Sequence, residues 1–194
     1  MAEACAGVQV APDETLVQRA CRGDSAAREE LFRRHFDVAY RVAYRLLGQE
    51  QDALDAVQDG FLKGVTHLHE FDGRSTFRTW LLRIVTNASL DSGRKRRRRP
   101  TIPLGDSRTD GIEPEVTEDP GLGLHRADLR RRIDQALARL SPETRQTFVL
   151  FAEAEFSYKE IAECQGLPIG TVMSRLHYAR QKLQSFLEGI DEPA

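Results

Sequence analysis

The chain has 194 residues, 40% of them hydrophobic and 30% charged, which suffices for one large or two small folded domains. Its formal net charge is only -2. No apolar stretch approaches a membrane span, and no signal peptide begins the chain, so we expect no membrane insertion. Three cysteines without Cys-x-x-Cys spacing fit a reducing cytoplasm, where we place the protein.

The first half of the chain is predicted to be a helical domain. Long runs of alternating β-branched residues are absent from the sequence, which argues against an all-β fold. After a loose leader over 1–12, a domain over 13–99 is expected from the spacing of apolar residues. Gly23, Asp24 and Gly48 mark breaks and caps within it. The expected helices cover 13–22, 25–47, 50–69 and 76–97, with a turn over 71–76 before the last.

Three aspartates of the expected helix 50–69 recur at helical spacing. Asp52, Asp55 and Asp59 step along one face, with Gln58 and Leu62 beside them. This face fits docking onto a basic partner helix. It equally fits a solvated helix start that is stabilised by the helix dipole. No histidine lies at matching helical spacing, so we expect no metal site and no cofactor.

A strongly basic segment follows, from Arg74 to Arg99. Such a cluster indicates a polyanionic partner. Phe71, Phe77 and Trp80 are interleaved with it, and exposed aromatic rings beside arginines can stack on unpaired bases. The alternatives are that Phe77 and Trp80 belong to the core, and that the arginine run is a solvated tail or a targeting patch.

Breakers of regular structure concentrate in residues 100–127, where proline and glycine recur among acidic side chains. We interpret this segment as a flexible acidic linker. A second helical domain is expected over 128–187, followed by a tail over 188–194. Ser141 and Pro142 mark a helix start inside this domain.

The second domain carries the pattern of a helix-turn-helix. Ser157 and Glu160 have capping-box spacing, Gly166 can end the first helix, and Pro168 cannot continue it. A second helix from about residue 170 has its buried stripe on Val172, Leu176, Ala179, Leu183 and Leu187. Off that stripe lie four polar or aromatic residues that are candidates for reaching base edges in a major groove: Thr171, Ser174, Arg175 and Tyr178.

Together these segments resemble a bacterial sigma factor of the sigma-70 family, in the extracytoplasmic-function (ECF) group. The resemblance covers about residues 13–187. It is carried by Asp55 to Lys63, by Phe71 to Asn87 followed by Asp91 and Arg94, and by Leu140 to Phe148 with the helix-turn-helix. It implies an all-α fold in which a region 2-like domain, 13–99, is joined to a region 4-like domain, 128–187.

The resemblance also implies roles for individual residues. Core polymerase would bind Asp55, Gln58, Asp59 and Leu62. Minus-ten DNA, with one flipped base in the loop Phe71 to Phe77, would bind Phe71, Arg74, Ser75, Thr76, Phe77, Arg83, Asn87, Arg94 and Arg97. Minus-thirty-five DNA would bind the four residues of the second helix.

The implied function is promoter recognition and melting as a non-enzymatic subunit of RNA polymerase, under the control of an anti-sigma factor. Two alternatives stay open. A sigma-like mimic that sequesters an anti-sigma factor need not keep DNA-contacting residues, and a two-domain repressor would not need the acidic docking helix. Met173 and Tyr178 depart from the basic residues that are frequent at their positions in relatives, which predicts fewer phosphate contacts.

Overall fold

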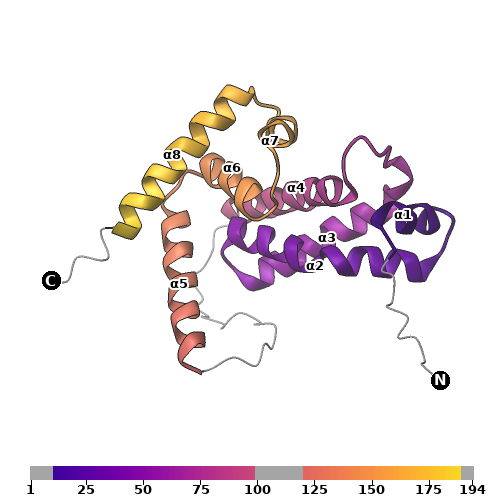
Figure 1. Ribbon diagram of the computed structural model, residues 1–194, viewed down its shortest axis with the longest axis horizontal. Coiled ribbons are helices and arrows are strands. Elements are labelled where there is room, and N and C mark those ends of the chain that lie inside the picture. The colour runs from indigo at the N-terminus through magenta and orange to yellow at the C-terminus, as the bar shows by residue number, and fades with distance from the viewer. Residues whose placement is uncertain (1–10, 99–119, 189–194) are drawn as a thin grey trace, which may run out of the picture.

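The computed structural model describes residues 11–98 and 120–188 (Figure 1), and these are all-helical apart from turns. Residues 1–10, 99–119 and 189–194 lie outside the described residues, and most of the predicted leader (1–12), linker (100–127) and tail (188–194) falls on them. The helices are α1 (Asp13–Cys21), α2 (Ser25–Leu47), α3 (Glu50–Thr66), the 3-10 helix η1 (Leu68–Glu70), α4 (Phe77–Arg98), α5 (Pro120–Ala138), α6 (Pro142–Ala152), α7 (Tyr158–Gln165) and α8 (Ile169–Glu188). The predicted all-α class with two helical domains is confirmed.

Local capping chemistry sets both ends of α2 and the start of α4. The Asp24 carboxylate accepts a hydrogen bond from the Ala27 amide at 3.0 Å, which caps α2. Gly48 ends the same helix in the left-handed conformation, with φ of 73°. Thr76 lies just before α4, and its hydroxyl oxygen accepts from the Thr79 amide at 3.1 Å. Asp24 and Gly48 are cap residues that the sequence pattern predicts.

Two helix boundaries differ from expectation. The third helix ends at Thr66, and a 3-10 turn replaces its expected last residues. Helix α5 begins at Pro120 rather than at residue 128, so it occupies the end of the segment interpreted as linker. Proline is compatible with a first helical position, because the amide hydrogen it lacks would have no intrahelical partner there.

Helices α1 to α4 form the N-terminal domain. Its helices pack unusually closely where α3 crosses α4, because α3 presents glycine at the crossing. A Cβ atom on Gly60 would lie 2.8 Å from Cγ2 and 3.0 Å from Cα of Val85. A Cβ atom on Gly64, one turn later, would lie 3.0 Å from the side chains of both Leu81 and Phe32. The close approach fixes the orientation of the outer face of α3 relative to α4.

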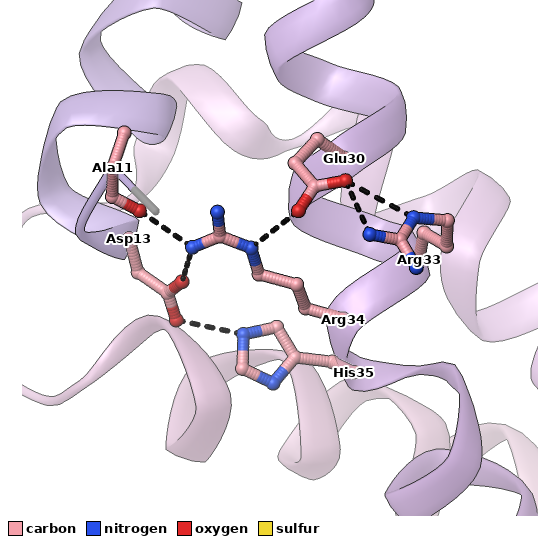
Figure 2. A network of polar contacts seen from close by, with 6 residues as sticks. All are labelled: Ala11, Asp13, Glu30, Arg33, Arg34 and His35. Carbon is pink, nitrogen blue, oxygen red and sulfur yellow. Dashed lines mark hydrogen bonds and ion pairs between the residues drawn. The ribbon is translucent and has the colours of Figure 1, made fainter. Parts of the chain in front are cut away.

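A polar network ties α1 to α2 (Figure 2). The Asp13 carboxylate lies between the Arg34 guanidinium, at 3.4 Å, and Nε2 of the buried His35, at 2.7 Å. Arg34 also donates to Glu30 at 2.7 Å and to the Ala11 carbonyl at 2.6 Å. The start of α1 is therefore held in place by charged groups as well as by its buried Leu16.

Helices α5 to α8 form the C-terminal domain. Val172, Leu176 and Ala179 of α8 are buried, as the predicted stripe requires. Leu183 is partly buried against the cluster formed by Leu137, Leu140 and Ala179. The side chain of Leu187 lies outside the described residues.

The two domains pack against each other, on opposite sides of the view in Figure 1. One apolar cluster runs through both, joining Val42 and Val85 to Val149, Phe156 and Ile161. Around it, among the described residues, five ion pairs cross the interdomain interface: Arg41–Glu153, Arg45–Glu153, Arg45–Asp134, Arg78–Glu155 and Arg83–Glu163. In each pair the N-terminal domain supplies the arginine and the C-terminal domain supplies the carboxylate.

Candidate nucleic-acid interface

The outer face of α3 carries the four residues predicted to bind a protein partner. Asp55, Gln58, Asp59 and Leu62 are all exposed, and their spacing places them on one side of the helix. The opposite side, with Ala56 and Val57, is buried. Leu62 is 69% exposed, the largest exposed fraction among the large hydrophobic side chains of the described residues. The structure thus brings these four residues together as an acidic face with an apolar end.

The turn before α4 presents Arg74 to solvent. Asp72 shapes this turn by accepting a hydrogen bond from the Arg74 amide at 3.1 Å, and Gly73 adopts a φ of 73° that favours glycine. The Arg74 side chain is 89% exposed, with its guanidinium 3.0 Å from Asp72. Ser75 and Thr76 follow at the surface. The Arg74 guanidinium is therefore a solvent-exposed basic group in this turn.

Phe77, which was predicted to contact DNA, is buried in the structure. Its side chain is 3% exposed and lies among the rings of Phe32, Phe71 and Trp80, with centroids 5.7 to 5.9 Å away. Tertiary packing against α2 buries it, in line with the alternative interpretation as a core residue. Phe77 thus packs beneath the surface of the turn, and Phe71, which is half-buried, is the more exposed of the two rings.

Along α4, a row of polar residues continues from the turn. Arg83, Asn87 and Arg94 lie within one side of the helix, because their spacings of four and seven residues return to nearly the same angle. Asn87 and Arg94 are exposed, whereas Arg83 is half-buried at the interdomain interface, 3.6 Å from Glu163. Arg97 continues the row by spacing, but its side chain lies outside the described residues.

The helix-turn-helix is formed by α7 and α8. The Ser157 hydroxyl accepts from the Glu160 amide at 3.3 Å, and the Glu160 carboxylate accepts from the Ser157 amide at 2.9 Å. This completes the capping box. Gly166 ends α7 with φ of 65°, which allows the chain to turn sharply into α8.

The exposed front of α8 differs in part from the predicted set. Ser174 and Tyr178 face solvent, whereas Thr171 and Arg175 are half-buried at the flanks. Met173, 53% exposed, and the exposed His177 complete the front and were not among the predicted contacts. Their spacing relative to the buried stripe could have revealed them, but they carry no fixed charge. Met173 and Tyr178 therefore give this front an apolar and an aromatic side chain beside Ser174 and His177.

Comparison with known families agrees with this arrangement. Residues 31–99 match the family description Sigma-70 region 2, and residues 130–183 match Sigma-70, region 4. The RNA polymerase sigma-H factor of Pseudomonas aeruginosa is 30% identical, over 91% of this chain and 94% of its own. The chain is a member of the sigma-70 family, in its ECF group.

Other relatives of this ECF sigma factor extend the likeness. SigE of Mycolicibacterium smegmatis is 38% identical over 85% of this chain, which spans 64% of that relative's length. SigW of Bacillus subtilis is 29% identical over 90% of this chain and 96% of its own.

Two solved structures are similar along most of their length. CnrH, solved in complex with the cytosolic domain of CnrY, has a TM-score of 0.68 and 29% identity, over 93% of this chain and 99% of its own. RpoE of Bartonella quintana, solved in complex with the anti-sigma factor NepR, has a TM-score of 0.64 and 26% identity, over 81% of this chain and 94% of its own.

Within residues 11–98 and 120–188, no helix is both long and apolar enough to cross a bilayer. In the same part of the chain, no three histidine, cysteine or acidic side chains gather as metal ligands would. The surfaces of interest are thus the acidic face of α3, the basic row of α4 with its preceding turn, and the front of α8.

Proposed function

We propose that this ECF sigma factor uses three separate surfaces during initiation. The α3 face (Asp55, Gln58, Asp59, Leu62) binds core RNA polymerase. The turn and row at α4 (Phe71, Arg74, Ser75, Thr76, Arg83, Asn87, Arg94) hold the minus-ten strand. The front of α8, from Thr171 to Tyr178, reads the minus-thirty-five duplex. We place the protein in the cytoplasm, where the polymerase works.

The observation that carries the proposal is the exposed Leu62 at the end of an acidic helical face. Removing an apolar side chain of this size from water contributes about 1.5–3 kcal/mol, so a partner gains by covering it. A repressor has no use for such a face. A mimic of a sigma factor would not need the exposed Arg74, Asn87 and Arg94 on the DNA side.

The test compares two matched double variants in gel filtration with bacterial core polymerase. Asp55→Ala with Gln58→Ala removes an acid and an amide from the α3 face. Glu14→Ala with Gln18→Ala removes an exposed acid and amide from α1, away from that face. Exposed substitutions of this kind change folding stability by no more than about 0.5 kcal/mol. We expect the first variant to lose co-elution and the second to keep it.

Co-elution of both variants with polymerase would remove the docking assignment. Promoter-specific transcripts from the wild-type complex are the second requirement of the proposal. Their absence, together with tight binding to duplex DNA by the free chain, would favour a repressor.

We also propose an anti-sigma partner for this chain. Of the two solved structures named above, that of RpoE holds the anti-sigma factor NepR, and that of CnrH holds the cytosolic domain of CnrY. An apolar pocket of about 540 Å³ lies between α5, α6 and α8, with Arg45 of α2 at its rim. Apolar side chains of a partner segment fit such a pocket, whose lining includes Ile133, Leu137, Phe148 and Leu183.

A further inference from the structure

Helix α1 is connected to both flanks of the turn before α4, although it lies outside the match to Sigma-70 region 2, which begins at residue 31. Its first residue, Asp13, is linked through His35 to Phe77, which follows the turn. Its last residue, Cys21, contacts η1, which precedes the turn. We propose that α1 braces this turn, and that Asp13 and His35 are positioning residues for capture of the minus-ten strand. The inference rests on the proposed function of the turn.

The Asp13 carboxylate fixes the imidazole of His35 (Figure 2). Nε2 of His35 lies 2.7 Å from the carboxylate, and the residue is 8% exposed. An ionised carboxylate only accepts hydrogen bonds, so Nε2 carries the hydrogen in this contact. Because the ring is bound at one edge and buried, its plane is held in one orientation.

The imidazole in turn packs against Phe77. The two ring centroids are 5.5 Å apart, and the ring planes are inclined by 51°. Phe77 meets Phe71 edge-on at 5.9 Å and Trp80 at 5.7 Å. Aromatic pairs at such distances prefer particular orientations, so the orientation of one ring limits that of the next. A continuous path of contacts therefore leads from Asp13 to Phe71.

A second contact from α1 reaches the other flank of the turn. The Cys21 thiol donates a weak hydrogen bond to the Leu68 carbonyl of η1 at 3.7 Å. The same carbonyl accepts from the Phe71 amide at 3.2 Å. Between its two ends, the buried side of α1 belongs to the same apolar cluster as Leu68 and Phe77. The backbone that enters the turn and the ring that follows it therefore both rest on α1.

The placement of the turn depends on these flanks. At its tip, Arg74 is held by Asp72, which belongs to the turn itself and cannot fix it relative to α2 or α4. A surface that captures a strand gains affinity when it is ordered in advance, because ordering during binding costs free energy. Loosening α1 should therefore weaken strand capture, while the α3 face keeps its ability to bind polymerase.

The network in Figure 2 supplies a matched pair of variants. Asp13 and Glu30 both pair with Arg34, and their side chains are 28% and 33% exposed. Asp13 also contacts His35, whereas Glu30 contacts Arg33 instead. Asp13→Ala therefore cuts the path to the turn. Glu30→Ala removes a partner of Arg34 with similar exposure and leaves that path intact.

His35→Gln separates the ring contact from the attachment of α1. A glutamine amide can still donate to Asp13, but it has no ring to pack against Phe77. If the imidazole ring transmits the position of α1 to the turn, His35→Gln behaves like Asp13→Ala. If attachment of α1 alone matters, His35→Gln behaves like wild type, and His35 is not a positioning residue.

The experiment measures polymerase binding and strand separation independently. Each chain is combined with core polymerase, and binding is followed by gel filtration. Transcript starts of the wild-type holoenzyme on genomic DNA are mapped by sequencing, and one mapped promoter becomes the probe. Permanganate, which oxidises unpaired thymines, then measures the opened fraction of that promoter at limiting holoenzyme. Urea unfolding of the free chains measures their stability.

We expect Asp13→Ala and His35→Gln to bind polymerase like wild type and to lower the opened fraction about two- to tenfold, the equivalent of one aromatic contact. Glu30→Ala should match wild type in both measurements. Equal losses in Glu30→Ala and Asp13→Ala would overturn the inference, as would an unchanged opened fraction in His35→Gln. If Asp13→Ala does not fold, His35→Gln against Glu30→Ala still decides.

Two further outcomes separate this inference from the proposed function. Loss of polymerase binding together with promoter opening in the variants would show a general loss of structure and would overturn the positioning role alone. A wild-type holoenzyme that gives no specific starts would overturn the proposed function and, with it, the inference that rests on it.

Discussion

Gly60 of α3 gives a direct test of how the α3 face is positioned, because α3 and α4 meet there without a side chain between them. In Gly60→Ala the new Cβ would lie 3.0 Å from Cα of Val85, a backbone atom that cannot rotate away. Overpacking of this kind costs about 1–3 kcal/mol. Alanine recovers about 1 kcal/mol through helix propensity. We therefore expect a net loss of roughly 1 kcal/mol in the free energy of unfolding.

Gly93→Ala in α4 is the matched control. Its Cβ would meet only Cδ2 of Leu47, at 3.4 Å, so the propensity gain stands almost alone. The difference between the two variants isolates the packing cost, about 1–3 kcal/mol. Urea unfolding measures it, and with a slope of about 1–2 kcal/mol/M the midpoints differ by roughly 1 M. A Gly60→Ala chain as stable as Gly93→Ala would refute the close crossing.

Three further predictions concern other parts of the chain. If exposed Met173 contacts a thymine methyl group, replacing that thymine by deoxyuridine in a promoter duplex should weaken DNA binding by wild type about fourfold, because one lost methyl contact is worth ~0.8 kcal/mol. The same replacement should leave DNA binding by Met173→Ala unchanged. Equal losses of affinity in both chains would contradict this. Burial raises the pKa of the Cys164 thiol, so iodoacetamide should label exposed Cys21 well before Cys164, as peptide mapping would show; equal rates would count against the packing of α7. Burial opposes the charge of Glu160, but hydrogen bonds, mainly from Ser157, lower the pKa of its carboxyl overall. The contribution of ionised Glu160 to the free energy of unfolding is therefore present above about pH 4.5 and is lost as the pH falls through the lower folded-state pKa. Wild type should lose stability in acid more steeply than Glu160→Gln. Parallel curves of stability against pH would refute the capping contribution.

Features that depend on neighbours in the chain could be predicted from the sequence. Ser157 and Glu160 are three residues apart, and both hydrogen bonds of their capping box form. Gly166 takes the left-handed conformation because the turn after α7 demands it. Such interactions close within one helical turn, so their residue types and spacing are sufficient evidence.

Features that depend on distant packing could not be predicted. Arg45 meets Glu153 across 108 positions of sequence, and no local pattern indicates that pairing. The sequence around Phe77 is compatible with a DNA contact and with a core residue. Only the packing of Phe32 from α2 against its ring shows that Phe77 is buried. The exposed Met173 and His177 on the front of α8 were not predicted, because the sequence analysis favoured other residues of that helix.

The aromatic cluster at the turn before α4 has a spectroscopic consequence. Trp80 is the single tryptophan of the sequence, and it is half-buried with its ring 5.5 Å from Phe71 and 5.7 Å from Phe77. Its emission can be excited apart from that of the four tyrosines. A base that enters the turn, or a movement of Phe71, changes the surroundings of this one indole. The protein therefore carries its own unlabelled optical reporter at the turn before α4, where we propose that the minus-ten strand binds.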